Sequence, residues 1–383
     1  MEELYVDSEE KLSDLCRRIE SSDVIAIDTE FLREKTYYAQ VCLIQIATDE
    51  VIACVDPLAI SNLDPFLDLL YQPDKLKIMH SARQDLEIFF DLRGAIPQPV
   101  YDTQIAATLL GHGDQLGYAK LVKVMMSINV DKEHARTDWS QRPLDEAQIH
   151  YAMNDVRYLI PMYRQQMQRL REKGRDEWLQ ADFESLADIN IYAPAPDQVW
   201  KRVKGSKLLK RGQLVVLQQL ASWREQYAKQ SNRPRKWIIP DDVLIDIARR
   251  CPTSVEAMEK IRGWNSYTKK FANDILQQIQ HAKSIPEDRW PSLEHAAVLT
   301  VEQDAMVDFL MGIVRMSALK NDVTPALLAT RKDLEHLVLG RKDINVLSGW
   351  RYELAGKELL EFLNGKKAIV VEENHIVVID DET

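Results

Sequence analysis

The stretch VIAIDTEF, residues 24–31, combines an apolar strand with two acidic side chains. Its apolar residues lie on both sides of the strand alternation, as expected of a strand that is covered on both faces. Side chains two positions apart on a strand share a face, so Asp28 and Glu30 point the same way, roughly 6–7 Å apart. Such a pair is costly at the edge of a core unless a cation joins it. Oxygen ligands predict magnesium or manganese rather than zinc.

Two other segments offer further carboxylates. Asp85 begins a helical pattern after the apolar run 76–80, and Tyr151 and Asp155 lie one turn apart on one face of a predicted helix. An Asp-x-Glu pair alone occurs by chance in many proteins, and Tyr151 could simply pack its ring on the sheet. Four carboxylates and a phenol from three segments favour a metal-dependent active site.

Strand-like and helical patterns alternate through the first 172 residues, which predicts an α/β domain. Two early strand-like runs are close in sequence, so part of the sheet is expected to be antiparallel. The predicted strands cover 24–32, 41–47, 51–55 and 76–80, and the predicted helices cover 82–92, 103–110, 117–127 and 145–172.

The segments Asp28-x-Glu30, His80-x-x-x-x-Asp85 and Tyr151-x-x-x-Asp155 resemble, in order and separation, the three motifs of the DEDDy 3′-5′ exonucleases. Two further runs, Leu116–Leu121 and 136–144, are similar to the ribonuclease D branch of that superfamily. The resemblance implies an RNase H-like (DnaQ-like) α/β exonuclease domain with a mixed sheet.

Proline-containing segments divide the rest of the chain into units. The predicted units are an exonuclease domain over 1–172, an acidic helix and linker over 173–207, and two all-α units over 208–289 and 290–383. The first helical unit resembles the HRDC (helicase-and-RNase-D C-terminal) domain, and the second resembles a more divergent HRDC copy followed by a tail. Residues 368–379 read as a hairpin or paired ends.

The net charge of −11 is unevenly distributed. Residues 1–175 hold 20 basic and 29 acidic residues, whereas residues 197–290 hold 19 basic and 10 acidic residues. A basic module between acidic ones predicts a polyanionic partner, although a merely solvated face is the alternative. The candidate RNA-binding residues are Lys201, Arg202, Lys204, Lys207, Lys210, Arg211, Arg233, Arg235, Lys236 and His80.

Several single residues have two possible roles. His80 could touch the substrate or be a hydrogen-bonded core histidine. Trp200 could stack on a base, whereas Trp237 precedes an apolar helix entry and is predicted to be core, with a stacking role as the alternative. Gln45 and Thr29 could contact the terminal nucleotide, although Thr29 more simply fixes the strand end. Asp102, near a strand end, is predicted to cap a helix, with an additional site carboxylate as the alternative.

Composition narrows the class of protein. The N-terminus is acidic and lacks an apolar secretory core, and no apolar run approaches the roughly 20 residues of a membrane span. The four cysteines lack Cys-x-x-Cys spacing, which argues against a zinc site, and Cys42 and Cys54 read as reduced core residues. These features predict a cytoplasmic protein with no membrane contact. No obligate protein partner is evident from the sequence, and the oligomeric state stays open.

The resemblance implies a metal-dependent 3′-5′ exoribonuclease that releases 5′-mononucleotides and trims tRNA precursors with 3′ extensions and other stable RNAs. It also implies two Mg²⁺ or Mn²⁺ ions: Asp28 would bridge them, Glu30 and Asp155 would hold the ion that carries the attacking water, and Asp85 would act on the second. Tyr151 would orient the water or help take its proton. A DNA exonuclease of the same superfamily and a non-catalytic RNA-binding scaffold are the alternatives, and RNA over DNA rests on the resemblance.

Overall fold

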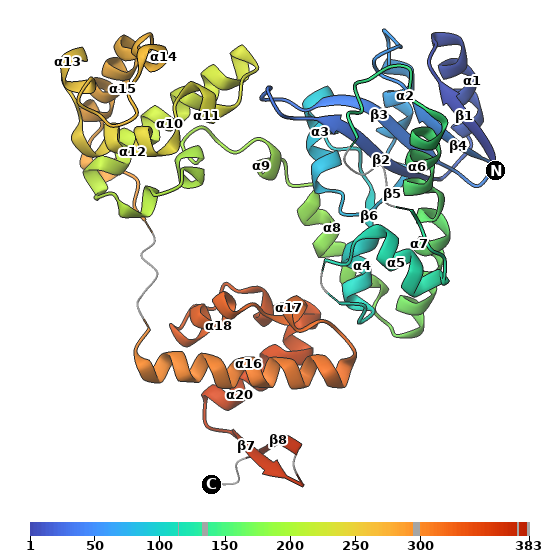
Figure 1. Cartoon of the computed structure of the whole chain (residues 1–383). Helices are drawn as coiled ribbons and strands as arrows, with labels where there is room; N and C mark the ends of the chain where they lie inside the picture. The colour runs from blue at the N-terminus through green and yellow to red at the C-terminus, as the bar shows by residue number, and fades with distance from the viewer. Residues whose placement is uncertain (114, 132–136, 294–298, 374, 381–383) are drawn as a thin grey trace.

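The computed structural model describes residues 1–113, 115–131, 137–293, 299–373 and 375–380. An α/β unit comes first, and two helical units follow it (Figure 1). Arg136 and Asn374, which belong to two of the sequence runs discussed above, lie outside the described residues.

The α/β unit contains a six-stranded sheet with the order β1-β4-β3-β2-β5-β6. Among these strands only β3 runs antiparallel to its neighbours, which confirms the predicted mixed sheet. The strands are β1 (Glu2–Val6), β2 (Val24–Leu32), β3 (Gln40–Ala47), β4 (Val51–Val55), β5 (Leu76–Met79) and β6 (Val100–Asp102).

Helices cover both faces of this sheet, so β2 is apolar on both sides. Ile25 and Ile27 pack in the core under α1 (Glu9–Ile19), α2 (Asp64–Leu70) and α3 (Arg83–Arg93). Ala26 packs in the opposite core, under the remaining helices of the unit. These are α4 (Thr103–Leu109), α5 (Tyr118–Met126), α6 (Glu146–Arg157) and α7 (Leu159–Glu172).

One predicted helix is divided in the structure. The pattern over 145–172 predicts a single helix, but α6 ends at Arg157 and α7 begins at Leu159. The Tyr118 hydroxyl donates to the Asn154 carbonyl at 2.6 Å and accepts from the Tyr158 N–H at 3.2 Å. It therefore occupies the place of the helical bond between residues 154 and 158. Pro161 also lacks the N–H that a continuous helix would use, so the chain bends here.

The first helical unit packs around the long helix α10 (Arg211–Ser231). Trp200 is only 2 % exposed in this core, whereas Trp237 is 52 % exposed, so both tryptophan predictions were wrong. Ile238 and Ile239 take the buried positions after Trp237. The shorter helices of the unit are α11 (Arg235–Ile238), α12 (Asp241–Arg250), α13 (Val255–Met258), α14 (Ser266–Lys269) and α15 (Ala272–Ser284). Between α7 and α10 lie α8 (Gln180–Leu186) and α9 (Ile189–Tyr192).

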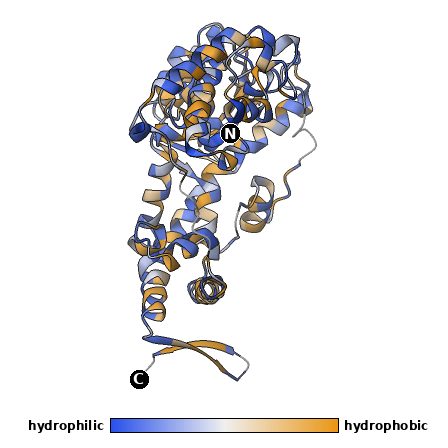
Figure 2. Cartoon of the chain, turned by 90° about the vertical axis from the view of Figure 1, so that its left-hand side faces the viewer, coloured by the Kyte–Doolittle hydropathy of each residue, from blue (hydrophilic) through white to orange (hydrophobic). Residues whose placement is uncertain are grey.

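The second helical unit has its own core around α16 (Val301–Asn321). It adds α17 (Pro325–Leu328), α18 (Arg331–Val338), α19 (Gly349–Arg351) and α20 (Lys357–Leu363). The antiparallel pair β7 (Lys367–Glu372) and β8 (His375–Asp380) follows, as the sequence predicts. Ile369 and Val378 of this hairpin pack against that core, and the hairpin carries further apolar residues near the C-terminal end (Figure 2). None of the described helices combines the length and apolarity that crossing a membrane requires.

The α/β unit contacts both helical units. Trp178, just after α7, stacks on Trp350 with ring centroids 4.7 Å apart and an interplanar angle of 3°. Arg175 donates to backbone carbonyls at the end of α16, and Arg351 pairs with Asp182 at 2.7 Å. On the other side, the loop between β2 and β3 bonds to the unit around α10.

Candidate active site

Asp28 and Glu30 lie at the carboxyl-terminal part of β2, on the same face as Ala26. Asp28 pairs in register with Gln45 of β3, and Glu30 pairs with Leu43. This is the face that α6 covers, since α6 packs against β2, β3 and β4. The strand therefore presents both carboxylates toward α6, and both side chains are partly exposed.

Helix α6 supplies the next two groups. It begins at a capping box in which the Asp145 carboxylate accepts from the Gln148 N–H at 2.7 Å and the Gln148 side chain accepts from the Asp145 N–H. Tyr151 and Asp155 follow one turn apart and are hydrogen-bonded to each other. Trp139 lies beside Tyr151 with ring centroids 6.1 Å apart. The helix thus aims a phenol and a carboxylate at the strand pair.

Asp85 reaches the site from the other side of the sheet. It lies in the first turn of α3 and is buried, and it accepts a 2.5 Å hydrogen bond from the Thr29 hydroxyl. Asp102 fixes the start of this helix, because its carboxylate accepts from the N–H groups of Ser81 and Ala82 at 3.0 and 2.8 Å. The same carboxylate caps α4, as predicted. Thr29 therefore fixes Asp85 rather than facing a nucleotide.

The electrostatics identify these carboxylates as one cluster. Burial, followed by the charges of Asp85, Asp155 and Glu30, raises the pKa of Asp28 well above its ordinary value. Burial, then Asp155 and Asp85, raises the pKa of Glu30 to about 8. Burial also raises the pKa values of Asp85 and Asp155 to about 7. Among the residues that the structure describes, no basic side chain is a main cause of these four shifts.

This donor set suits a divalent cation. The four carboxylates offer only oxygen ligands, which Mg²⁺ and Mn²⁺ prefer. A bound cation would also relieve the electrostatic repulsion between the carboxylates. Within the described part of the chain, no three His, Cys, Asp or Glu side chains are already spaced to hold one ion. Thr29 holds one oxygen of Asp85.

Other residues beside the cluster have structural contacts. The His80 Nδ1 atom lies 2.9 Å from the Thr103 hydroxyl, and burial lowers the pKa of its imidazole. The contact of His80 with RNA stays a prediction. Gln45 is completely buried, and neither atom of its amide has a hydrogen-bond partner among the residues that the structure describes. It cannot reach a nucleotide in this conformation.

The sequence patterns did not predict that Arg142 and Trp139 support the position of Tyr151. Arg142 forms two hydrogen bonds to the Asp56 carboxylate, at 2.6 and 2.7 Å, and donates to the Trp139 carbonyl at 2.8 Å. It thereby holds Trp139 against Tyr151. The run 136–144 contained both residues, but only the fold reveals that Asp56, 86 positions away, is the partner.

The candidate RNA-binding cations are distributed over the unit around α10 and the segment before it. Lys201, Arg202, Lys204 and Lys207 are exposed around two short 3₁₀ helices, Val199–Arg202 and Ser206–Leu208. Lys210 and Arg211 are exposed at the start of α10, and Arg233 and Lys236 are exposed near α11. Arg235 is partly buried beside Glu225, at 3.3 Å.

Comparisons with known proteins agree with this arrangement. The family model for 3′-5′ exonuclease matches residues 4–171, and the HRDC domain matches residues 213–279. Ribonuclease D of Zymomonas mobilis is 38% identical over 96% of this chain and 95% of its own length. Ribonuclease D of Sphingobium indicum is 36% identical over 97% of both chains. A crystal structure of Escherichia coli RNase D, an exoribonuclease involved in structured RNA processing, has a TM-score of 0.82 and 29% identity, covering 95% of this chain and 99% of that one.

Proposed function

Because this chain belongs to the ribonuclease D family, we propose that its acidic cluster hydrolyses RNA from the 3′ end and releases 5′-mononucleotides. One observation carries the proposal: four carboxylates from β2, α3 and α6 converge at one place, and among the described residues no basic side chain is a main influence on their pKa values. A substrate phosphate would be repelled from this place unless metal cations occupied it.

Asp28, Glu30, Asp85 and Asp155 would hold two divalent ions, Mg²⁺ or Mn²⁺. Such ions lower the pKa of bound water and stabilise charge on the leaving oxygen. Asp28 would contribute to both sites, Glu30 and Asp155 to the first, and Asp85 to the second. Tyr151 is within hydrogen-bonding distance of Asp155 and would orient the attacking water. Burial, followed by the charges of Asp155, Glu30 and Asp28, raises the pKa of its phenol.

The substrates we propose are tRNA precursors with 3′ extensions and other stable RNAs. The basic segment 197–290 would hold the body of such an RNA, because its 19 basic and 10 acidic residues make it net positive in a chain whose net charge is −11. We divide the chain into the catalytic domain 1–172, a linker 173–207, an HRDC domain 208–289 and a second, divergent HRDC-like domain within 290–383. The four free cysteines agree with a reducing cytoplasm.

The test is hydrolysis of a 3′-labelled RNA by the unmodified chain and by the Asp28→Asn variant, with and without Mg²⁺. We expect Mg²⁺-dependent release of labelled mononucleotide, and a loss on the order of 10³-fold in the variant, because it lacks the shared ligand charge. A DNA strand of the same sequence tests the alternative substrate. Near-normal turnover by a folded Asp28→Asn variant would reject the assignment of the site.

A further inference from the structure

A cavity of about 600 Å³ lies at the junction between the α/β unit and the helical unit around α10. Its walls come from the segment after β2, from α3, from the linker around α9 and from the start of α11. The lining residues are Arg33, Glu34, Thr36, Tyr37, Arg83, Glu87, Ile191, Tyr192, Arg202, Pro234, Arg235, Lys236 and Trp237. We call this cavity the junction pocket.

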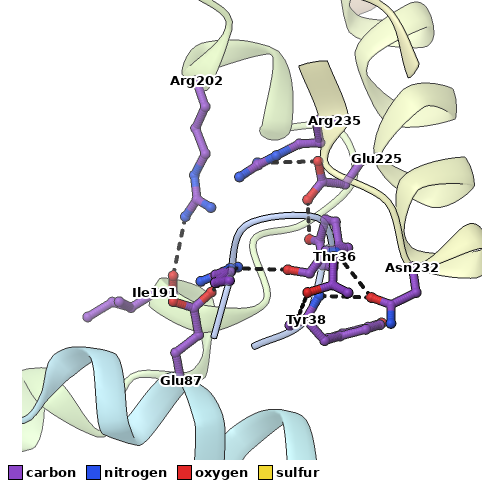
Figure 3. Close-up of polar contacts among 10 residues, drawn as sticks. Thr36, Tyr38, Glu87, Ile191, Arg202, Glu225, Asn232 and Arg235 are labelled. Atoms are coloured by element: carbon purple, nitrogen blue, oxygen red, sulfur yellow. Dashed lines mark hydrogen bonds and ion pairs between the residues drawn. The ribbon is translucent and has the colours of Figure 1, made fainter. Parts of the chain in front are cut away.

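Polar contacts between the two units hold the junction pocket in shape. The Tyr37 hydroxyl donates to Glu225 at 2.5 Å, and the Asn232 side-chain oxygen accepts from the N–H groups of Tyr37 and Tyr38 at 3.1 Å each (Figure 3). Within the linker wall of the pocket, Arg202 donates to the Ile191 carbonyl at 3.2 Å. Several directional hydrogen bonds join the loop after β2 to the helical unit around α10. They fix the position of one pocket wall relative to the other.

The pocket carries unbalanced positive charge in a chain whose net charge is −11. Two of its five cations are neutralised, since Arg33 pairs with Glu87 at 2.9 Å and Arg235 pairs with Glu225 at 3.3 Å. Arg83 and Lys236 are exposed and form no hydrogen bond or ion pair with any residue that the structure describes. Arg202 bonds to a carbonyl, so three lining cations have no ion-pair partner among the described residues, against one such lining carboxylate, Glu34. The remaining positive charge suits a phosphate backbone.

Trp237 adds a second, independent feature. Its side chain is 52 % exposed at the rim of this cationic pocket, although it belongs to a short helix whose other apolar residue, Ile238, is buried. An exposed indole beside arginine and lysine is the combination on which single-stranded nucleic acid stacks its bases. A phosphoprotein or a simple anion would use the cations but not the exposed ring.

The position of the pocket relates it to the acidic cluster. Arg33 comes three residues after Glu30, directly beyond β2, and Arg83 and Glu87 lie on α3 together with Asp85. Residues 83 and 87 share one helix face, and residue 85 lies about 200° round from residue 83, on the opposite side. The pocket and the carboxylates are thus separated by roughly one helix diameter, ~10–12 Å.

We propose that the junction pocket binds a nucleotide of the RNA strand a few residues upstream of the 3′ end. Trp237 stacks on its base, and Arg83, Arg202 and Lys236 contact the adjacent phosphates. This proposal rests on the proposed function and extends it: the exonuclease unit and the helical unit together make one subsite, which neither completes alone.

Binding in the catalytically inactive Asp28→Asn background tests the proposal. The probe is a fluorescein-labelled single-stranded oligoadenylate of about twelve nucleotides, a length within the usual site sizes of single-strand binders. We expect Trp237→Ala to raise Kd about 10-fold and Trp237→Phe to raise it less than about 3-fold, because phenylalanine keeps a stacking face. Replacing both Arg83 and Lys236 by Gln should make the slope of log K against log[salt] less negative by about 1.4.

The matched controls separate this outcome from general effects. Lys332→Glu changes an exposed lysine of the second helical unit and should leave Kd within about twofold of the parent. Circular dichroism checks that each variant is folded. Tryptophan fluorescence should fall when oligoadenylate binds, and the fall should be smaller in Trp237→Phe.

Two results would overturn the proposal. In the first, the folded variants Trp237→Ala and Arg83→Gln/Lys236→Gln have the same Kd, salt slope and fluorescence change as the parent. In the second, heparin competes equally with RNA for the parent and for Trp237→Ala, and Trp237→Ala binds RNA with the same Kd as the parent. That result would identify a general anion site. Failure of the proposed function is read separately, as absence of Mg²⁺-dependent RNA hydrolysis by the unmodified chain.

Discussion

Tyr151 lies at the meeting point of the acidic cluster and its aromatic support. Asp155 accepts its hydrogen bond and Trp139 packs beside its ring. Tyr151→Phe keeps the ring contact and removes only the hydroxyl. We expect kcat to fall about 10²–10⁴-fold, as for other groups that position a reacting proton, with RNA affinity nearly unchanged. Single-turnover kinetics and binding measured on the same RNA check this. A kcat within twofold of the parent would make Tyr151 a packing residue.

Asp56 is only 1 % exposed and carries three strong hydrogen bonds, two from Arg142 and one from Tyr5. Burial alone would raise its pKa, but the bonds from Arg142 and Tyr5 outweigh burial and lower it. Asp56→Asn should therefore cost about 2–3 kcal/mol of stability at pH 7, less than a fully buried pair because Arg142 is partly exposed.

The pH dependence of this loss has a definite sign. A carboxylate with a depressed folded-state pKa stabilises above its unfolded value of about 4, and the contribution disappears as pH falls through the folded pKa. The difference between parent and Asp56→Asn in urea unfolding should thus be full at pH 7 and shrink below about pH 4. Asp49→Asn is the control, because Asp49 pairs with Arg164 at the exposed surface and should cost less than about 1 kcal/mol. A pH-independent difference would contradict the ion-pair explanation.

At the scale of elements, Tyr118 determines where α6 ends. Its hydroxyl replaces the helical bond between residues 154 and 158, directly beside Asp155. Tyr118→Phe leaves the Asn154 carbonyl without that donor, so we expect a loss of about 1–2 kcal/mol in unfolding free energy and a lower kcat. Tyr163→Phe is a matched control, because that tyrosine contributes a ring contact to Tyr101 on the same core. Equal effects of both substitutions would mean that the hydroxyl at 118 does not matter.

The same helices illustrate what sequence patterns predict and what they leave out. The 3.6-residue period over 145–172 correctly predicts helix and places Tyr151 and Asp155 on one face. The division at Tyr158 depends on Tyr118, a residue 40 positions away, and no local pattern contains that contact. The convergence of α3 with β2 and α6 likewise follows from sheet order, which alternation alone does not specify. The tryptophans at 200 and 237 were assigned wrongly because burial there depends on how short segments pack on α10.

At the scale of the whole molecule, chemistry and affinity are carried by different units. The carboxylates lie in the acidic α/β unit, and exposed cations are concentrated between residues 197 and 290. Replacing Lys201, Lys204, Lys207 and Lys210 by Glu should weaken binding of a tRNA precursor to the Asp28→Asn form. Each lost phosphate contact should make the salt slope less negative by about 0.7, because fewer counterions are released.

The matched control reverses four exposed lysines of the second helical unit, Lys320, Lys332, Lys342 and Lys357. Both variants change the net charge equally, so a difference between them reports location rather than total charge. Affinity is measured across a salt series. An unchanged slope in the first variant would mean that its lysines form only a solvated face and that other residues hold the RNA.

The stacked indoles of Trp178 and Trp350 provide a spectroscopic signal for the attachment of the second helical unit. Two parallel rings 4.7 Å apart, one from each unit, couple their electronic transitions. Detachment of that unit would therefore change the near-ultraviolet circular dichroism, whether or not any catalysis occurs. Separation of the two units can thus be followed by circular dichroism during heating, denaturant titration or RNA binding, without an added label.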